Sequence, residues 1–185
     1  MKLVVQIPCL NEAPRLPGLI AAVPRRIDGI ESVEVLVIDD GSNDGTTDVA
    51  LSSGADHVIR FAHNRGLAVA FQAGLREALR VGADIIVNTD GDGQYDSSSI
   101  PDLIGPILSG TADVVVGDRR PHLNPDFSRS KRQLQRLGSW VVEAAGARGA
   151  RDAASGFRAF TRESALDFIV TDRFTYTVES TIQIG

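Results

Sequence analysis

The stretch VLVIDDGSNDGTTD (residues 35–48) gives the clearest indication of the fold. It opens with an unbroken apolar run, which is typical of a strand buried on both faces, as in a parallel sheet. Asp39 and Asp40 end that run, and two glycines then permit positive φ in a turn that leads into a helix. A strand that passes through a tight turn into a helix is the repeating unit of an α/β domain.

The same alternation continues along the chain. Apolar runs predict strands at residues 3–7, 33–38, 57–61, 84–87 and 113–116, and apolar stripes at helical spacing predict helices at 66–81 and 100–108. No internal repeat, low-complexity segment or linker interrupts the pattern. We therefore expect one α/β domain with a doubly wound, mostly parallel central sheet flanked by helices.

The amino-acid composition limits the partners and the cellular location that we expect for the protein. The chain has 185 residues, 43% of them hydrophobic, and a formal net charge of −5, which argues against a nucleic-acid partner. Its one cysteine, Cys9, cannot form an internal disulfide and ends an apolar run, so we expect a buried, inert thiol. No apolar run approaches the roughly 20 residues that span a bilayer, and no signal peptide is evident. The sequence predicts a soluble, cytoplasmic protein whose membrane contact, if any, is peripheral on the cytoplasmic face.

Polar clusters follow four of the predicted strands. They are Asn11 with Glu12, DDGSNDGT (39–46), TDGDGQYD (89–96) and GDRR (117–120). In open α/β sheets, ligands bind beyond the carboxyl ends of the strands. Four clusters on the same edge of one sheet therefore predict a single site.

The two halves of the cluster DDGSNDGT (39–46) have different interpretations. Ser42, Asn43 and Asp44 are natural turn and helix-capping residues, so they need no ligand. Asp39 and Asp40 are harder to explain, because adjacent carboxylates repel one another without donors such as ribose hydroxyls or a base N–H.

The segment DGDGQYD (90–96) predicts a metal site. Asp90, Asp92 and Gln94 offer the oxygen ligands that suit Mg²⁺ or Mn²⁺, although an ordinary Asp/Gly turn is the alternative. An EF-hand is excluded because Tyr95 stands where that loop requires glycine and Pro101 where it requires glutamate. Such an incomplete cage favours a metal that is shared with a phosphate-bearing ligand.

A basic segment runs from Arg119 to Arg136, with six cationic residues against one acidic residue. Arg129, Arg132 and Arg136 share one face if this segment is helical. The segment is either a solvated helix face or an anion site, for an acceptor phosphate or an acidic lipid surface.

Several enzyme classes lack their defining motifs here. The first strand is followed by PCLNEAP, which excludes the phosphate turn of a nicotinamide dehydrogenase, and neither a P-loop nor a GxSxG nucleophile motif occurs. A sugar nucleotidyltransferase would need a glycine-rich, basic loop after the first strand, and none is present.

Six segments together resemble the family-2 glycosyltransferases of GT-A fold, in particular the polyprenyl-phosphate, dolichyl-phosphate-mannose-synthase-like branch. In chain order they are IPCLNE, VIDDGSNDGT, NRGLAVAFQAG, TDGDGQYD, DAASGFRAFTRE and FTYTVESTIQ. The resemblance implies a catalytic domain over residues 1–185, truncated at its C-terminal end. It also implies an inverting transfer of a sugar from a UDP- or GDP-linked donor to an acceptor, most readily a polyprenyl or dolichyl phosphate.

For the donor, the resemblance implies two sets of residues. Nucleotide-binding residues would be Pro8, Asn11, Glu12, Asp39, Asp40, Gly66 and Asp90. The divalent metal, Mg²⁺ or Mn²⁺, would be held by Asp90, Asp92 and Gln94, with Asp90 and Asp92 also counted as catalytic.

For the acceptor, the resemblance implies a second group. Acceptor-binding residues would be Ser155, Gly156, Phe157, Arg158, Arg132, Arg136 and Glu179, with Arg119 facing a phosphate. A phosphate acceptor is already ionised near neutral pH, whereas a saccharide hydroxyl would need a base, for which Asp152 is the candidate. Two alternatives stay open: transfer to a saccharide hydroxyl, and a nucleotide-sugar-binding domain without turnover.

Overall fold

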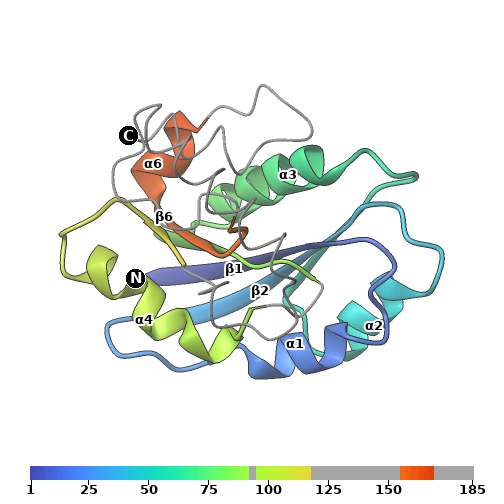
Figure 1. Cartoon of the computed structure of the whole chain (residues 1–185), viewed down its shortest axis with the longest axis horizontal. Helices are drawn as coiled ribbons and strands as arrows, with labels where there is room; N and C mark the ends of the chain where they lie inside the picture. The colour runs from blue at the N-terminus through green and yellow to red at the C-terminus, as the bar shows by residue number, and fades with distance from the viewer. Residues whose placement is uncertain (92–94, 118–154, 169–185) are drawn as a thin grey trace, which may run out of the picture.

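The computed structural model describes residues 1–91, 95–117 and 155–168, and these residues form one six-stranded sheet with helices on both faces (Figure 1). The strands are β1 (Lys2–Cys9), β2 (Ser32–Asp39), β3 (His57–Arg60), β4 (Ile85–Asn88), β5 (Val114–Val116) and β6 (Arg158–Thr161). The helices are α1 (Leu16–Ala22), α2 (Thr46–Ser52), α3 (Leu67–Arg80), α4 (Ile100–Leu108) and α6 (Arg162–Asp167), with a short 3₁₀ turn, η1 (Ser97–Ser99). The α/β class, the five predicted strands and the two predicted helices are confirmed.

The side-chain alternation of β1 divides the core into two layers. Leu3, Val5 and Ile7 pack on the face covered by α1, α2 and α4, whereas Val4 packs on the face covered by α3 and α6 (Figure 1). Both faces are buried because successive strand residues point to opposite sides of the sheet. This explains why the strands read as continuous apolar runs instead of alternating ones.

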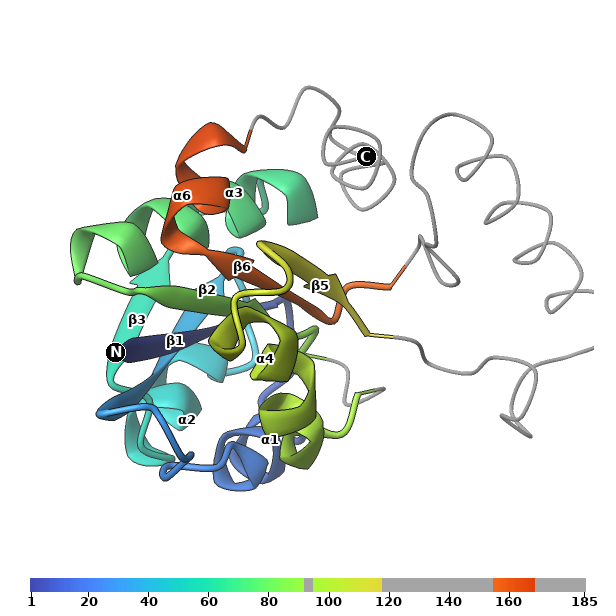
Figure 2. The same cartoon turned by 90° about the vertical axis from the view of Figure 1, so that its left-hand side faces the viewer.

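Strand order brings one late segment to the predicted site. The order is β3-β2-β1-β4-β6-β5; β1 to β4 run parallel, and β6 runs antiparallel between β4 and β5. In the turned view, β5 and β6 lie together at one end of the sheet (Figure 2). The carboxyl ends of β1, β2, β4 and β5 therefore share an edge with the beginning of β6, where residues 155–157 enter.

The sequence did not predict the strand β6, since the resemblance implies only acceptor binding for residues 155–158. Among the residues that the structure describes, no helix is long and apolar enough to cross a membrane.

Candidate functional site

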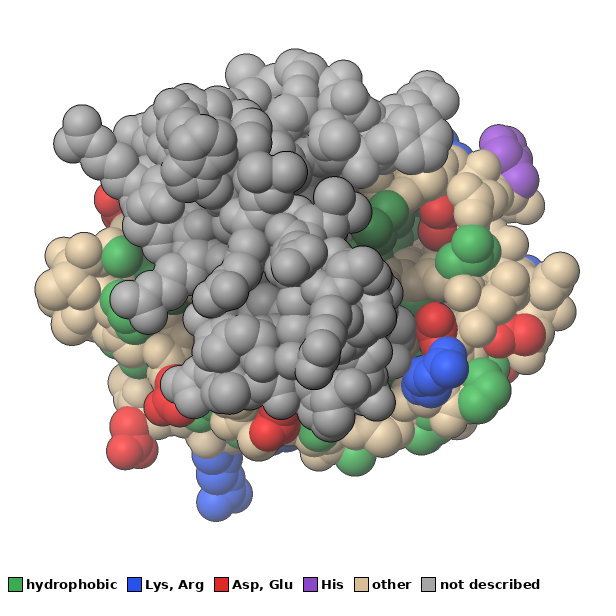
Figure 3. All heavy atoms as spheres, viewed as in Figure 1, with side chains coloured by type: hydrophobic (Ala, Val, Ile, Leu, Met, Phe, Trp, Pro, Cys, Tyr) green, Lys and Arg blue, Asp and Glu red, His purple; other side chains and the backbone are tan. Residues whose placement is uncertain are grey.

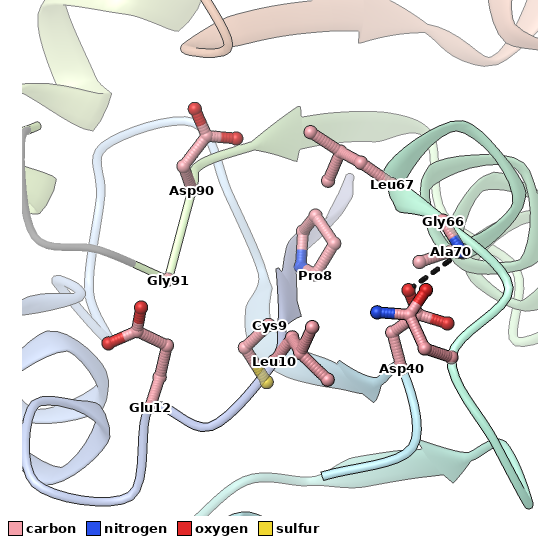
Figure 4. Close-up of a pocket in the computed structure, with 11 residues that line it drawn as sticks. Pro8, Cys9, Leu10, Glu12, Asp40, Gly66, Leu67, Ala70, Asp90 and Gly91 are labelled. Carbon is pink, nitrogen blue, oxygen red and sulfur yellow. Dashed lines mark hydrogen bonds between the residues drawn. The ribbon is translucent and has the colours of Figure 1, made fainter. Parts of the chain in front are cut away.

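A cavity of about 320 Å³ opens at the carboxyl edge of the sheet (Figure 4). Its lining comes from the end of β1, from the β2 and β3 ends with the start of α3, and from the end of β4. The lining residues are Pro8, Cys9, Leu10, Glu12, Asp40, Asn64, Gly66, Leu67, Ala70, Asp90 and Gly91. The volume lies at the lower end of the roughly 300–1,000 Å³ range of small-molecule sites.

Acidic groups lie on two sides of this cavity. In the close-up, Glu12 and Asp90 lie on one side with Gly91 between them, and Asp40 lies on the other side beside the start of α3 (Figure 4). Pro8 lies between the two sides. On the face of the molecule where these strands end, acidic and hydrophobic side chains surround a hollow (Figure 3).

Asp40 ties the end of β2 to the start of α3. Its Oδ1 accepts a hydrogen bond from the backbone N–H of Arg65 at 2.7 Å, and its Oδ2 accepts one from the N–H of Gly66 at 2.9 Å. Gly66 has φ of 92°, a conformation that favours glycine. The carboxylate is thus held at the wall of the cavity by donors that carry no charge.

Asp39 is held in a similar way but points elsewhere. Its Oδ1 accepts from the backbone N–H of Ser42 at 2.8 Å, its Oδ2 accepts from the hydroxyl of Thr47, and its exposed fraction is 1%. The protein itself therefore supplies hydrogen-bond donors to both adjacent carboxylates, so a ligand is not needed to explain them. Asp39 is outside the cavity lining, and its contact with a nucleotide stays a prediction.

The loop after β1 is linked to the turn after β2. The backbone N–H of Asn11 donates to Ser42 Oγ at 2.8 Å, and Asn11 Oδ1 accepts from the N–H of Asn43 at 3.0 Å. Asp44 accepts from the Thr46 hydroxyl and from two backbone N–H groups, and the Thr46 hydrogen bond lowers its pKa. These hydrogen bonds agree with the turn interpretation of Ser42 to Asp44, but the helix-capping part is wrong, because the N-cap of α2 is Gly45 and makes no side-chain capping hydrogen bond. Asn11 lies outside the lining, so its predicted nucleotide contact is untested.

The pKa of the Cys9 thiol depends on its burial and on the carboxylates of this edge. Burial raises the pKa of the thiol to about 12, and the carboxylates of Asp39, Glu12, Asp44 and Asp40 add to that rise. At neutral pH the thiol is protonated and unreactive, because the thiolate is the nucleophile. The expectation of a buried Cys9 is confirmed, although the residue also lines the cavity.

Asp90 is the described member of the predicted metal-binding set, since Asp92 and Gln94 lie outside the described residues. Within the described ranges, no group of three His, Cys, Asp or Glu side chains could hold a metal ion. Of the predicted metal-binding set, the described part of the chain therefore places one carboxylate, Asp90, in the cavity lining, and its hard oxygen atoms suit Mg²⁺ or Mn²⁺.

The predicted acceptor segment lies against this carboxylate. Ser155, Phe157 and Arg158 are buried, and the Nε of Arg158 donates to the carbonyl oxygen of Ser155 at 2.8 Å. Gly156 packs directly on Asp90. The structure thus brings residues 155–158 beside Asp90, while their contact with an acceptor stays a prediction. The remaining predicted residues, Arg119, Arg132, Arg136, Asp152 and Glu179, lie outside the described residues.

Five of the seven predicted nucleotide-binding residues line the cavity: Pro8, Glu12, Asp40, Gly66 and Asp90. The sequence did not predict the other lining residues, Cys9, Leu10, Asn64, Leu67, Ala70 and Gly91. Three of these missed residues fall within NRGLAVAFQAG, the segment from which only Gly66 was selected, so a signal for them was present.

Comparison with solved structures agrees with this fold. The chain is similar to glucosyl-3-phosphoglycerate synthase from Mycobacterium tuberculosis, whose structure contains Mn²⁺, UDP and glucosyl-3-phosphoglycerate. The TM-score is 0.72 at 23% sequence identity, and the match covers 98% of this chain and 64% of that one.

Two sequence relatives match almost the whole chain. A glycosyltransferase of Haloferax volcanii, AglJ, is 34% identical over 183 residues, which cover 95% of this chain and 56% of the relative. An undecaprenyl-phosphate mannosyltransferase of Micrococcus luteus is 30% identical over 99% of this chain and 77% of its own length. The chain therefore spans little more than half of the first relative.

A family model matches residues 4–168, a range that includes β6 and every cavity-lining residue that the structure describes. The chain belongs to glycosyl transferase family 2.

Proposed function

We propose that this chain is the catalytic domain of a glycosyltransferase that moves a sugar, with inversion, from a UDP- or GDP-linked donor to a polyprenyl phosphate. The observation that carries the proposal is the cavity at the carboxyl edge of the sheet, which brings five predicted nucleotide-binding residues together. Membership of glycosyl transferase family 2 and the UDP-bound structural relative support the donor class.

The chemistry of the cavity fits a donor that is bound through a divalent cation. Glu12, Asp40 and Asp90 would repel a diphosphate by themselves, so a cation between the two anions resolves the conflict. Asp90, with Asp92 and Gln94, would hold Mg²⁺ or Mn²⁺. When bound, such an ion neutralises the charge that develops on the leaving diphosphate.

A phosphate acceptor reduces what the protein has to supply. It is ionised near neutral pH, so it needs cations to position it and no base to activate it. Arg119, Arg132 and Arg136 are the proposed cations, and residues 155–158 are the proposed acceptor segment. The undecaprenyl-phosphate mannosyltransferase among the relatives supports this acceptor class. A lipid-linked acceptor would in turn fit a peripheral position of this chain on the cytoplasmic face of a membrane.

The first test is calorimetric titration with UDP and with GDP, each in the presence and absence of Mn²⁺. We expect one nucleotide to bind tightly only with the metal, which also identifies the base of the donor. Turnover is then measured with the matching nucleotide sugar and either polyprenyl phosphate or a saccharide acceptor. Transfer to the saccharide alone would replace the acceptor proposal, and nucleotide binding without release of nucleoside diphosphate would reduce the protein to a binding domain.

A substitution tests the metal assignment. Asp92→Asn should weaken metal-dependent nucleotide binding by at least about 10-fold, because it removes a charged ligand. Asp96→Asn is the matched control: Asp96 lies in the same acidic segment, but its side chain caps η1 by accepting from Ser98 N–H at 2.9 Å. Equal loss of binding in both variants would contradict the assignment.

A further inference from the structure

The peptide of Gly156 is held from both sides by buried side chains. Its N–H donates to the hydroxyl oxygen of Tyr95 at 2.7 Å, and its carbonyl oxygen accepts from Asn88 Nδ2 at 2.6 Å. Asn88 is fully buried and Tyr95 is 8% exposed. A buried peptide group whose donor and acceptor are both satisfied in this way has one favoured orientation.

The position of this peptide limits the space that the Asp90 carboxylate can occupy. A Cβ atom built on Gly156 would lie 2.6 Å from Asp90 Oδ1 and closer still to Oδ2, which no real side chain allows. Asp90 therefore packs against the bare Cα of Gly156. A side chain at residue 156 would therefore require either the carboxylate or the residue 156 peptide to shift.

Asn88 owes its own orientation to the neighbouring strand. Its Oδ1 accepts from Gln6 Nε2 at 2.9 Å, and Gln6 is its register partner on β1. Because the amide oxygen faces Gln6, the amide nitrogen faces Gly156. The chain of contacts thus begins on β1, crosses β4 and ends at the peptide that packs on Asp90.

Tyr95 fixes the other side of the peptide. Its ring stacks on Phe157 with centroids 5.4 Å apart and an interplanar angle of 22°. Stacking holds the ring, and the hydroxyl then meets the N–H of Gly156 at a defined place. Tyr95 directly follows Gln94, so one residue connects the predicted metal-binding segment to the segment that precedes β6.

We infer that Asn88 and Tyr95 are positioning residues, which hold the Gly156 peptide so that Asp90 presents its carboxylate to the metal and the donor diphosphate. The identity of the ligand rests on the proposed function. The claim that the Gly156 peptide determines the position of the Asp90 carboxylate does not. It assigns a role to two residues that the sequence motifs left without one.

The binding test uses Tyr95→Phe, which removes the hydroxyl and keeps the ring. Mn²⁺ binding is followed by the electron paramagnetic resonance signal of the free ion, in the presence of whichever nucleoside diphosphate the wild type binds. We expect about 10-fold weaker Mn²⁺ binding, the size of effect seen when an outer partner of a metal ligand is lost. Asn88→Ala should weaken binding at least as much.

The matched control is Ile86→Val, which opens a small gap in β4 without touching the Gly156 peptide. It should lower the melting temperature while the Mn²⁺ affinity stays at the wild-type value. A Tyr95→Phe protein that binds Mn²⁺ as tightly as the wild type would overturn the inference, because a purely structural role changes stability alone.

Crystal structures separate this inference from the proposed function. If the wild type binds neither UDP nor GDP with Mn²⁺, the proposed function fails, and ligand-free structures of the wild type and Gly156→Ala still decide the positioning role. A displaced Asp90 carboxylate beside an unmoved residue 156 supports it. An unmoved Asp90, with residue 156 shifted away from Asn88 and Tyr95, overturns it.

Discussion

The two edges of the sheet treat their carboxylates differently. At the amino edge, Glu34 pairs with Lys2 and with His57, each at 2.7 Å, and Asp56 pairs with Arg25 at 2.5 Å. At the carboxyl edge, the donors to Asp39 and Asp40 are backbone N–H groups and a hydroxyl. Across the described ranges, no basic side chain pairs with either of these two carboxylates.

The comparison shows that carboxylates at one edge stabilise the fold through ion pairs, whereas those at the other edge keep their charge for binding. Ion pairs cancel charge, so the amino edge needs nothing from outside. Around Asp39 and Asp40, neutral donors satisfy hydrogen bonds and leave the charge in place, which favours a cation, whereas Glu12 in the same cavity pairs with Arg15 at 2.7 Å. Burial is the main cause of the raised pKa of Cys9, and the carboxylates of this edge raise that pKa further.

The largest effect should come from breaking the carboxyl edge. Asp40→Ala leaves the N–H groups of Arg65 and Gly66 without their acceptors, so we expect the free energy of unfolding to fall by about 3 kcal/mol. Nucleotide binding should fall as well, because the start of α3 lines the cavity. Urea titration and calorimetry measure the two effects. Asp28→Ala, at an exposed carboxylate, is the control and should change neither quantity.

A smaller effect is expected at the amino edge. Asp56→Ala removes the acceptor for the N–H of Val35 and the partner of Arg25, and we expect a loss of about 1.5 kcal/mol, since the pair is partly exposed. Metal-dependent nucleotide binding should stay at the wild-type value. A parallel loss of binding in the folded variant would mean that the two edges are coupled and that the contrast between them is wrong.

The smallest expected effect is the pH-dependent contribution of Glu34 to stability at the amino edge. Burial alone would raise the pKa of Glu34, but hydrogen bonds from Lys2 and His57 outweigh it and lower that pKa below its ordinary value of 4.5. A carboxyl whose folded-state pKa is lowered stabilises the fold above its unfolded-state pKa, and this stability is lost as the pH falls through the folded-state pKa.

We therefore expect Glu34→Gln to cost under about 1 kcal/mol at pH 6 and to converge with the wild type as the pH falls below 4. Unfolding free energies measured from pH 6 to pH 2.5 test this expectation. A difference that stays constant with pH would show that the ion pairs contribute nothing.

Local sequence signals predicted most of the fold and only part of the site. The runs that became β1, β2 and β4 are long or strongly apolar, and the 100–108 helix was bounded as the structure has it. The strand β6 escaped because its four residues pair only with strands distant in the chain, and so short a segment carries too little periodicity to stand out.

The same limit applies to the partners of the acidic residues. The donors to Asp40 lie 25 and 26 residues further on and are backbone groups, which side-chain chemistry cannot reveal. The contact between Asn88 and Gly156 depends on how β6 is inserted between β4 and β5. Residue types marked this edge as a site, but only the three-dimensional arrangement shows which carboxylates are held by the protein itself.

The late entry of β6 has a consequence for synthesis. Every lining residue that the structure describes lies between Pro8 and Gly91, whereas Gly156 follows Asn88 by 68 residues. At a translation rate of about 5–20 residues per second, Gly156 leaves the ribosome roughly 3–14 seconds after Asn88. The nascent chain therefore exposes this part of the cavity before the peptide that supports Asp90 has been made. We expect metal-dependent nucleotide affinity to arise only after β6 has entered the sheet, late in translation.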